Sequence, residues 1–449
     1  MGMFPQISAP GIEVGGRRAT VFGMARSGLA AAGVLVSLGA SVTVVDEKPA
    51  EQLKEAMADI EGAGARAVAG IRGYDEMGRP DILIVSPGVP AAHPLLMDAR
   101  AAGAEVIGEI EFAYRLCDSP IIAITGTNGK GTVVRLIGEM LRRGGLDAPV
   151  VGNIGVPLVS EVGRRHDVIV TEISSFQLET TESFSPWVSG ILNITPDHRD
   201  RHPTIDQYVA AKSRIFRNQS TDGFTILNTD DAQVAALRPQ APARVLRVSL
   251  RDSTADARLE GDELVISPPG GAGLVVCEVG QLPLRGPHNI ANALTAAIAA
   301  SLCGIGAEAM AAAIAAQEPA AHLLCEVATV NGVRFIDDSK ATNPAAAMAD
   351  LSAVDGPLVL IAGGDPKGLD LSEFARTAAR RAEHLVLIGQ SAPALANAIG
   401  GAAPVTTAQS MQEAVRIAFE VSQAGWTVLL APACASFDMF RSMSERGEV

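Results

Sequence analysis

The sequence predicts an α/β protein of three domains, and three observations lead to this prediction. At 449 residues the chain is too long for one hydrophobic core and suggests about three domains of ordinary size. Short apolar runs alternate with helical patterns along most of the chain, which is typical of parallel sheets covered by helices. Glycine, proline and polar residues follow the apolar runs, so ligands are expected at the carboxyl ends of the strands.

Composition narrows the class of protein. The chain is 48% hydrophobic and 19% charged, which indicates a globular protein. Its net charge of −14 makes nucleic acid or an anionic membrane surface an unlikely partner. Five scattered cysteines without metal-ligand spacing favour free thiols in a reducing cytoplasm. Residues 1–18 contain no apolar signal core, and the alanine-rich run 289–307 is interrupted at Gly304 and Gly306, so we expect two packed helices there and no membrane span.

The first domain, residues 1–108, is predicted to be doubly wound. Its expected strands are 19–23, 41–45, 66–69, 81–86 and 105–107, with one helix running to Leu38 and another near 51–61. The turn from Gly23 to Gly28 and the acid Asp46 after the second strand suggest a dinucleotide site, but Ala25 replaces the middle glycine, so this signal is weak. Asp46 could equally cap a turn. The rigid turn 86–90 closes the fourth strand at the rim where a ligand would lie.

The second domain, residues 109–318, contains the most informative stretch of the chain. A strand beginning at Ile121 leads into Gly126-Thr127-Asn128-Gly129-Lys130-Gly131-Thr132, and a helical pattern follows. An ordinary turn between strand and helix is the alternative, but this order favours a phosphate-binding loop, with Lys130 reaching the outer phosphates. Gly131 stands where such loops normally have the Ser or Thr that binds Mg²⁺, and Thr132 follows one place on.

Polar residues follow other expected strands of this domain. Glu172 ends the buried run 167–172, one strand from the phosphate loop, which is the position of a Mg²⁺ ligand. The stretch 190–200 is another expected strand that runs into His198 and its flanking acids, and although a lone histidine at a strand end is more often structural, we favour a metal role for it.

Two helical stretches of the second domain leave alternatives open. Lys212 lies in the helical stretch 208–216 and is either a surface lysine or a desolvated lysine with a lowered pKa. Asn289 and Asn292 are three residues apart at a helix start, where they suit pairing with a base edge or capping of the turn.

The third domain, residues 319–449, again alternates strands and helices. Its expected strands are 333–336, 358–362, 384–388 and 427–430, each ending in a glycine, proline or polar turn. Their ends carry Lys340, Thr342, Lys367 and Ser436. Two lysines and two hydroxyls on one edge suit a small substrate that bears carboxylates.

Together these motifs resemble the Mur ligases of peptidoglycan synthesis over nearly the whole chain. The resemblance is carried by residues 126–130, 172–179, 193–198, 286–289, 338–343 and 436–438. The phosphate loop, which folylpolyglutamate synthetases share, is its least specific part. Residues 339–343 and 432–436 mark the branch of the family that adds D-glutamate.

The resemblance implies a Rossmann-like UDP-binding domain, a central P-loop ATPase-like domain and a C-terminal Rossmann-like domain. UDP-N-acetylmuramoyl-L-alanine would contact Arg26, Ser27, Asp46, Ser86, Pro87, Gly88, Asn153 and Ser174. ATP would contact Gly126, Thr127, Asn128, Gly129, Lys130, Gly131 and Thr132, together with Asn289, Asn292, Asp338 and Lys340. D-glutamate would contact Thr342, Lys367 and Ser436. Two Mg²⁺ sites would use Glu172, His198, a carbamate formed on Lys212, and Thr132 in place of a hydroxyl at Gly131. The expected catalytic residues are Lys130, His198, Lys212 and Lys340.

The implied reaction forms an amide bond at the expense of ATP. The alanyl carboxylate attacks the γ-phosphate to give an acyl phosphate, and the amine of D-glutamate then displaces phosphate. The third domain is expected to close over the second, and the protein is expected to be a cytoplasmic monomer that acts on small molecules. One alternative is a sister Mur or folylpolyglutamate-type ligase for another amino acid. Another is a nucleotide-binding protein without turnover, suggested by Gly131 and by Leu323, where the family has an arginine. A nicotinamide dehydrogenase is the least favoured.

Overall fold

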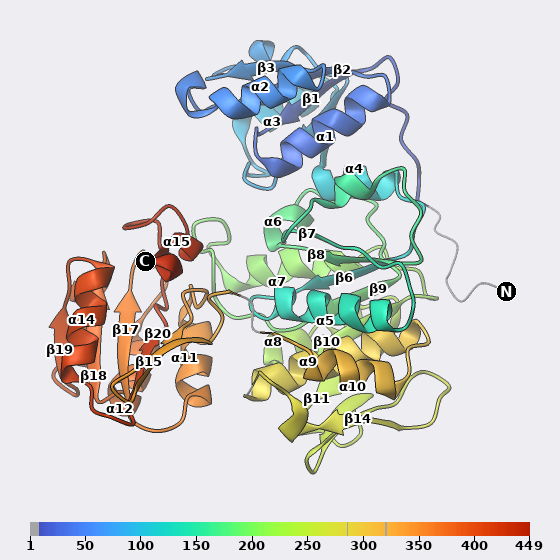
Figure 1. Ribbon diagram of the computed structural model, residues 1–449. Coiled ribbons are helices and arrows are strands. Elements are labelled where there is room, and N and C mark those ends of the chain that lie inside the picture. The colour runs from blue at the N-terminus through green and yellow to red at the C-terminus, as the bar shows by residue number, and fades with distance from the viewer. Residues whose placement is uncertain (1–8, 285, 319–320) are drawn as a thin grey trace. The chain divides into compact units, whose positions relative to one another are not determined.

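A computed structural model describes residues 9–284, 286–318 and 321–449, which form three sheets (Figure 1). The chain divides into two compact units. The first comprises Met1–Ile194, Asp206–Val279 and Ala291–Ala313, and the second comprises Thr195–Ile205, Gly280–Ile290 and Ile314–Val449. Three parts of the chain that were considered from the sequence lie outside the described residues. They are residues 1–8 of the N-terminus considered as a signal, Arg285 beside the motif 286–289, and Pro319, where the third domain was expected to start.

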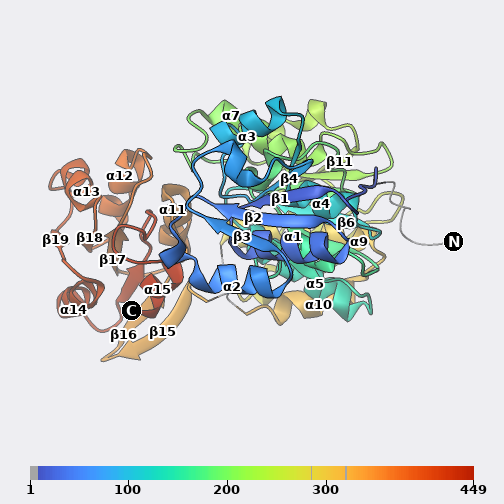
Figure 2. The same cartoon turned by 90° about the horizontal axis from the view of Figure 1, so that it is seen from above.

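The N-terminal sheet of the first unit is doubly wound, as expected. Its strands are β1 (Arg18–Phe22), β2 (Ser41–Asp46), β3 (Arg66–Ala69), β4 (Ile82–Val85) and β5 (Glu105–Gly108), all parallel in the order β3-β2-β1-β4-β5. Its helices are α1 (Arg26–Ser37), α2 (Lys54–Gly62) and α3 (Pro94–Ala101). Figure 2 shows α1 and α2 on one face and α3 on the other, which is why β4 is buried along its whole length. The helix expected near 51–61 begins later, at Lys54, after a separate 3₁₀ turn over Ala50–Gln52.

The central sheet of the first unit has nine strands in the order β14-β13-β12-β11-β10-β9-β6-β8-β7. Those strands are β6 (Ile121–Thr125), β7 (Val150–Gly152), β8 (Ile169–Glu172), β9 (Val188–Ile191), β10 (Phe224–Asn228), β11 (Arg244–Ser249), β12 (Ala257–Glu260), β13 (Glu263–Ile266) and β14 (Leu274–Glu278). All pairs from β7 to β12 are parallel, and the last three strands form antiparallel pairs. The strand β6 lies between β8 and β9, which is where the strand order reverses and ligands are expected.

The helices that accompany the central sheet are α4 (Glu109–Arg115), α5 (Lys130–Arg143), α6 (Ser175–Leu178), α7 (Ile205–Ser213), α8 (Ala232–Ala235), α9 (Pro287–Leu302) and α10 (Ala307–Ala315). The alanine-rich run forms two helices, α9 and α10, that end and begin around Gly304 and Gly306, as predicted. The helical stretch predicted over 208–216 is divided between α7 and a 3₁₀ turn over Arg214–Phe216.

The sheet of the second unit has six strands in the order β15-β16-β20-β17-β18-β19. They are β15 (Cys325–Val330), β16 (Val333–Asp337), β17 (Leu358–Gly363), β18 (His384–Ile388), β19 (Val405–Thr407) and β20 (Thr427–Leu430), and only the pair β15–β16 is antiparallel. The helices are α11 (Pro344–Ala353), α12 (Ser372–Arg381), α13 (Ala392–Ile399), α14 (Met411–Val421) and α15 (Met443–Glu448).

Alternation along β17 explains the two hydrophobic cores of this sheet. Leu358 and Leu360 pack on one face with residues of α11, α12 and α13, whereas Val359 and Ile361 pack on the other face with residues of α14. A buried strand with helices on both sides must be apolar at every position, since successive side chains point to opposite faces.

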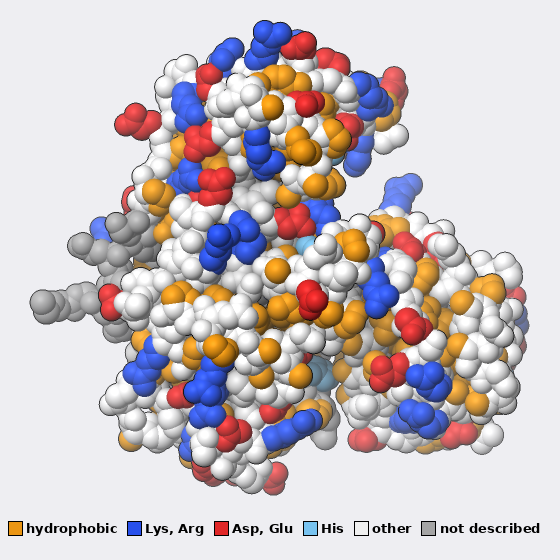
Figure 3. All heavy atoms as spheres, turned by 180° about the vertical axis from the view of Figure 1, so that it is seen from behind, with side chains coloured by type: hydrophobic (Ala, Val, Ile, Leu, Met, Phe, Trp, Pro, Cys, Tyr) orange, Lys and Arg blue, Asp and Glu red, His pale blue; other side chains and the backbone are white. Residues whose placement is uncertain are grey.

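Two further features bear on the predictions about nucleic acid and membranes. On the face shown in Figure 3, Lys and Arg side chains are interspersed with Asp and Glu. Within residues 9–284, 286–318 and 321–449, no helix is both long and apolar enough to cross a lipid bilayer.

Candidate active site

The predicted phosphate loop follows β6 and ends where α5 begins at Lys130. Gly129 has a φ of 84°, in the left-handed region that favours glycine. A Cβ at this position would lie 2.6 Å from Oδ1 of Asn292, so the loop backbone approaches that buried side chain closely. Gly131 and Thr132 follow in the first turn of α5, where Gly131 is buried and Thr132 half-buried. The structure therefore places Asn292, which the resemblance assigns to ATP, directly against the loop.

A reciprocal pair of hydrogen bonds fixes the conformation of this loop. The Asn128 backbone N–H donates to Oδ1 of Asn193 at 2.8 Å, and Nδ2 of Asn193 donates to the Asn128 carbonyl at 3.0 Å. The Thr127 N–H donates to the Asn193 carbonyl at 2.9 Å. Asn193 thus holds the loop from the end of the neighbouring strand β9. No role was predicted for Asn193 from the sequence, although a polar residue just beyond a strand end is a usable signal.

Two lysines donate to one carbonyl of the loop. Nζ of Lys130 lies 2.9 Å from the Gly126 oxygen and 2.8 Å from the Thr127 oxygen. Nζ of Lys212 lies 2.8 Å from the same Gly126 oxygen and 4.4 Å from the centre of the Tyr208 ring. Lys212 is 1% exposed, so of its two predicted environments the desolvated one is confirmed. Both lysines converge where the phosphates of a nucleotide are expected.

Glu172 ends β8 beside the phosphate loop, since it pairs with Ile124 of β6. It is 3% exposed, and its Oε1 accepts a 2.8 Å hydrogen bond from Nδ2 of Asn153. A buried carboxylate oxygen at this strand end is the kind of ligand that Mg²⁺ takes. No cluster of three or more His, Cys, Asp or Glu side chains able to hold a metal occurs among the described residues. The arrangement therefore fits a metal held mainly by one carboxylate and by nucleotide phosphates.

Seven of the eight residues predicted to bind the UDP-sugar line one cavity of about 480 Å³ in the first unit. They lie at or just after the ends of three different strands of the N-terminal sheet, or in the loop after β7, and they are Arg26, Ser27, Asp46, Ser86, Pro87, Gly88 and Asn153. Arg26 donates from Nη1 to the Gly155 carbonyl at 3.0 Å, across this cavity. Further lining residues that the sequence analysis missed are Glu47, Lys48, His93, Gly155, Pro157 and Gln177. Binding of the UDP-sugar by these residues remains a prediction.

Close backbone packing shapes the rim of this cavity. A Cβ on Gly28 would lie 1.9 Å from the Gly23 carbonyl oxygen, so only glycine lets α1 approach the end of β1 this closely. The Asp46 carboxylate accepts hydrogen bonds from the Met24 and Lys48 backbone N–H groups, each at 3.0 Å. Asp46 therefore does cap turns, the second of its two predicted roles, while also lining the cavity.

Ser174 is the exception among the predicted UDP-sugar residues. It is the N-cap of α6, where its Oγ accepts the Gln177 N–H and donates to Oε1 of Gln177. It is not among the described residues that line the cavity, whereas Gln177 is. The local role of Ser174 follows from a capping box that the sequence Ser174-Ser175-Phe176-Gln177 encodes.

In the second unit, the buried carboxylate of Asp197 contacts two predicted site residues, Lys367 and His198, and also Asn343. Nζ of Lys367 lies 2.7 Å from its Oδ1, the His198 N–H donates to the same oxygen at 2.8 Å, and Nδ2 of Asn343 lies 3.3 Å from its Oδ2. Burial acts to raise the pKa of Asp197, but Lys367 and His198 outweigh it and lower that pKa. Lys367 and His198 both have a positive φ, of 49° and 51°. Such strained backbone is often kept at functional positions.

The remaining residues predicted for the third domain lie at strand ends of the same unit. The loop after β16 holds Asp338, Lys340 and the half-buried Thr342, whose N–H donates to the Lys340 carbonyl at 2.8 Å. Ser436 is buried in the loop after β20. Asn289 is buried in the first turn of α9, where Nδ2 lies 3.0 Å from Nε2 of His288.

Arg446 of the C-terminal helix α15 joins these two loops. Its Nε lies 2.9 Å from Ser339 Oγ, its Nη2 2.7 Å from the Ser339 carbonyl and its Nη1 3.0 Å from the Cys434 carbonyl. The side chain is 1% exposed. Its role was not predicted from the sequence, because a single arginine in a polar stretch carries no local sign of burial.

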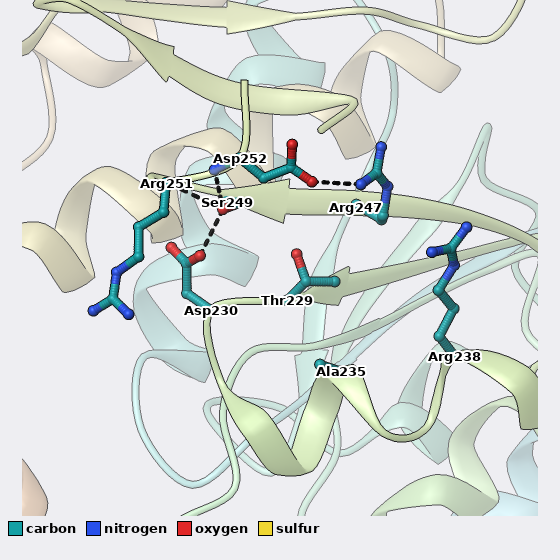
Figure 4. Close-up of a pocket in the computed structure, with 8 residues that line it drawn as sticks. All are labelled: Thr229, Asp230, Ala235, Arg238, Arg247, Ser249, Arg251 and Asp252. Carbon is teal, nitrogen blue, oxygen red and sulfur yellow. Dashed lines mark hydrogen bonds and ion pairs between the residues drawn. The ribbon is translucent and has the colours of Figure 1, made fainter. Parts of the chain in front are cut away.

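A second pocket, of about 340 Å³, lies at the ends of β10 and β11 (Figure 4). Within it, Asp230 accepts from Ser249 Oγ at 2.5 Å, and Nη1 of Arg247 pairs with Asp252 at 2.6 Å. Arg238 and Arg251 are exposed at its margins. The residues predicted from the sequence do not line this pocket.

Comparison with known proteins gives matches along the whole chain. Residues 17–108 match the Mur ligase MurD-like N-terminal domain, residues 124–300 the Mur ligase middle domain, and residues 324–434 the Mur ligase glutamate ligase domain. The UDP-N-acetylmuramoylalanine--D-glutamate ligase of Pelotomaculum thermopropionicum is 43% identical over 439 residues, 96% of each chain. That of Acidobacterium capsulatum is 40% identical and covers 98% of this chain and 96% of its own.

Among solved structures, a pseudomurein peptide ligase type C from Methanothermus fervidus matches with a TM-score of 0.62 at 19% identity, covering 92% of this chain and 96% of its own. The UDP-N-acetylmuramate-alanine ligase of Thermotoga maritima matches with a TM-score of 0.61 at 17% identity, covering 96% and 97%. At these identities the structures establish the fold alone.

Proposed function

Because this chain belongs to the Mur ligase family, we propose that it joins D-glutamate to UDP-N-acetylmuramoyl-L-alanine in an ATP-dependent step of peptidoglycan synthesis. The observation that carries the proposal is the match to D-glutamate ligases at 39–43% identity over nearly the whole chain. The solved sister ligases from Methanothermus fervidus, Thermotoga maritima and Acinetobacter baumannii are only 17–20% identical, which favours D-glutamate over another amino acid.

The N-terminal cavity suits the UDP-sugar. Arg26 offers a guanidinium to the diphosphate, and the turn 86–90 offers a close backbone approach. Asn153 lines this cavity and donates a 2.8 Å hydrogen bond to Glu172, the carboxylate beside the phosphate loop. A substrate that spans from this cavity past Asn153 would therefore bring its far end towards the phosphate loop.

The phosphate loop suits the triphosphate of ATP. Its backbone N–H groups and the start of α5 favour an anion, and Lys130 can exchange the Gly126 and Thr127 carbonyls for phosphate oxygens. Mg²⁺ would be held by Glu172 and the phosphates, with His198 and a carbamate on Lys212 as further proposed ligands. When bound, it would supply positive charge that offsets the repulsion between the substrate carboxylate and the triphosphate.

The loops of the third domain suit the incoming amino acid. Lys367 now pairs with Asp197 at 2.7 Å, and a carboxylate of D-glutamate would take the place of that partner. Thr342 and Ser436 offer hydroxyl donors at neighbouring strand ends. The chain's part in the chemistry is then to hold the alanyl carboxylate against the γ-phosphate, and afterwards to hold the amine of D-glutamate against the acyl phosphate.

We also propose that the protein works in the cytoplasm as a monomer. Its five cysteines are free thiols, which suits a reducing compartment.

The test is release of phosphate from ATP with UDP-N-acetylmuramoyl-L-alanine and a panel of amino acids. Release with D-glutamate alone supports the proposal. Release with L-lysine, diaminopimelate or L-glutamate instead would indicate a sister ligase. Absence of release with every pair would favour the nucleotide-binding protein suggested by Gly131 and Leu323. As a matched pair of variants, Lys130→Met should abolish release, and Lys54→Met, at an exposed position on α2, should not.

A further inference from the structure

Two carboxyl groups in the second unit are buried against each other. Asp338 directly follows β16, and Asp350 lies in α11. They are 2% and 4% exposed, and each carboxyl group shifts the pKa of the other, so the two side chains lie next to each other. Two ionised carboxylates in this position repel each other and cannot hydrogen-bond, because neither has a donor. A proton on one member of the pair removes both difficulties.

The unpaired oxygens of the two groups support the same conclusion. Oδ1 of Asp338 and Oδ2 of Asp350 are both buried, and among the described residues neither accepts a hydrogen bond from an N–H or hydroxyl group. Buried oxygens without a donor are rare and costly. One proton shared between the two carboxyl groups supplies the missing donor to the pair.

The surroundings favour one negative charge on the pair over two. Burial and the charge of neighbouring Asp337 raise the pKa of Asp338 to about 7. Asp350, the Ala341 N–H and Lys340 act to lower that pKa, but burial outweighs them. Burial and the charge of Asp338 raise the pKa of Asp350 well above its ordinary value. Asp337 is itself held by Nδ1 of His322 at 2.6 Å.

We infer that Asp350 is a positioning residue for Asp338: protonated Asp350 donates its hydroxyl to the Asp338 carboxylate and keeps the pair singly charged in the nucleotide site. The inference rests on the proposed function, which assigns Asp338 to ATP. The Asp338 N–H is fixed to the Leu430 carbonyl at 2.8 Å, and Asp350 and the Ala341 N–H hold the carboxylate, whose remaining lone pairs can accept from a nucleotide donor. A single charge also repels the triphosphate less than two charges would.

The first test measures binding of the non-hydrolysable analogue AMPPNP to the full chain between pH 6 and pH 9. Asp350→Asn can donate an N–H to Asp338 at every pH. We expect the Kd of the parent to rise several-fold as the shared proton is lost. The fold-increase in the Kd of Asp350→Asn over the same pH range should be at least three times smaller. Asp355→Asn, which removes one exposed charge just beyond α11, should follow the parent and controls for titration of the nucleotide. Identical pH profiles for the parent and Asp350→Asn would overturn the inference.

The second test needs no ligand. The folded pair holds a proton that unfolded carboxyls release above about pH 4, so the stability of the parent should fall as the pH rises from 5 to 8. The melting temperature of Asp350→Asn relative to the parent should therefore increase over this range by about 3 °C or more. If Asp350→Asn does not fold, Asp338→Asn removes the same pair and gives the same comparison. A constant difference in melting temperature would show that the two carboxyls do not share a proton. Absence of ligase activity in a chain that passes both tests would refute the proposed function and leave this inference standing.

Discussion

Replacing Arg446 by methionine should loosen the two loops proposed to hold ATP and D-glutamate. The change keeps an apolar side chain of similar length and removes three hydrogen bonds, to Ser339 Oγ, the Ser339 carbonyl and the Cys434 carbonyl. Hydrogen bonds from a charged donor contribute roughly 1.5–3 kcal/mol each, or roughly 5–9 kcal/mol for three. Burial lowers the pKa of Arg446 to about 10 from its ordinary value of 12.5, an opposing cost of about 3 kcal/mol. The expected loss of stability is therefore roughly 2–6 kcal/mol.

The assay can observe the third domain by itself. The chain has two tryptophans, Trp187 and Trp426, and Trp426 directly precedes β20. In a Trp187→Phe background, urea unfolding followed by Trp426 fluorescence should show a lower midpoint for Arg446→Met, and KM should rise for both ATP and D-glutamate. Arg441→Met, at an exposed position just before α15, should change the stability by less than about 0.5 kcal/mol. An unchanged midpoint in Arg446→Met would refute the reasoning.

Three further outcomes are expected. Burial raises the pKa of Glu109 to about 7, so the parent should lose stability as the pH rises from 5 to 8. Over that range, the free energy of unfolding of Glu109→Gln, measured with urea, should increase relative to that of the parent by on the order of 2 kcal/mol. Lys212→Ala should lose ligase activity, and formate or acetate should restore part of it by replacing a carbamate in the space left by this buried side chain. In a titration of phosphate release, Gly131→Ser should lower the Mg²⁺ concentration needed for half-maximal activity, because it supplies the missing hydroxyl. If Thr132 already binds the metal, Thr132→Ala should instead raise that concentration.

Each of these has a contrary result. A pH-independent difference between Glu109→Gln and the parent would mean that Glu109 is ionised in the fold throughout. Restoration of Lys212→Ala by an alkylammonium ion, and not by formate, would show that the site needs a cation. Coincident Mg²⁺ curves for the parent, Gly131→Ser and Thr132→Ala would remove both side chains from the metal site.

The sequence was sufficient for the five strands of the N-terminal sheet, for four of the six strands in the sheet of the second unit, where β15 and β19 were not predicted, and for residues that share a strand end. Apolar runs such as Leu358–Gly363 are continuous because helices cover both faces of the sheet, and this local pattern marks a buried parallel strand. The N-terminal cavity could be predicted because its residues lie at the ends of neighbouring parallel strands. Residues following β1, β2 and β4 are far apart in the sequence, yet parallel neighbouring strands bring their carboxyl ends together.

Contacts between distant side chains could not be predicted. Asn193 binds Asn128 across 65 positions, and Arg446 binds Ser339 across 107. Nothing local distinguishes such residues from solvent-exposed ones, since their partners are fixed only by tertiary packing. Asp350 is a further case, because an acid in a helix is ordinarily exposed. For Ser174 a local role could also be read from the sequence, since its capping box accounts for its hydroxyl, and its contact with substrate stays a prediction.

The shared Gly126 carbonyl has a consequence for how the protein should be handled. In the form without a carbamate on Lys212, Lys130 and Lys212 lie 2.9 Å and 2.8 Å from one oxygen, so the two ammonium nitrogens can be no more than about 6 Å apart. At an effective dielectric constant near 20 they repel by roughly 3 kcal/mol. Any tetrahedral oxyanion that enters the loop relieves this repulsion, so sulfate and inorganic phosphate should compete with ATP and also raise the thermal stability of the protein. Phosphate buffer would then lower the measured affinity for nucleotide, and phosphate released during turnover would inhibit the later part of each progress curve.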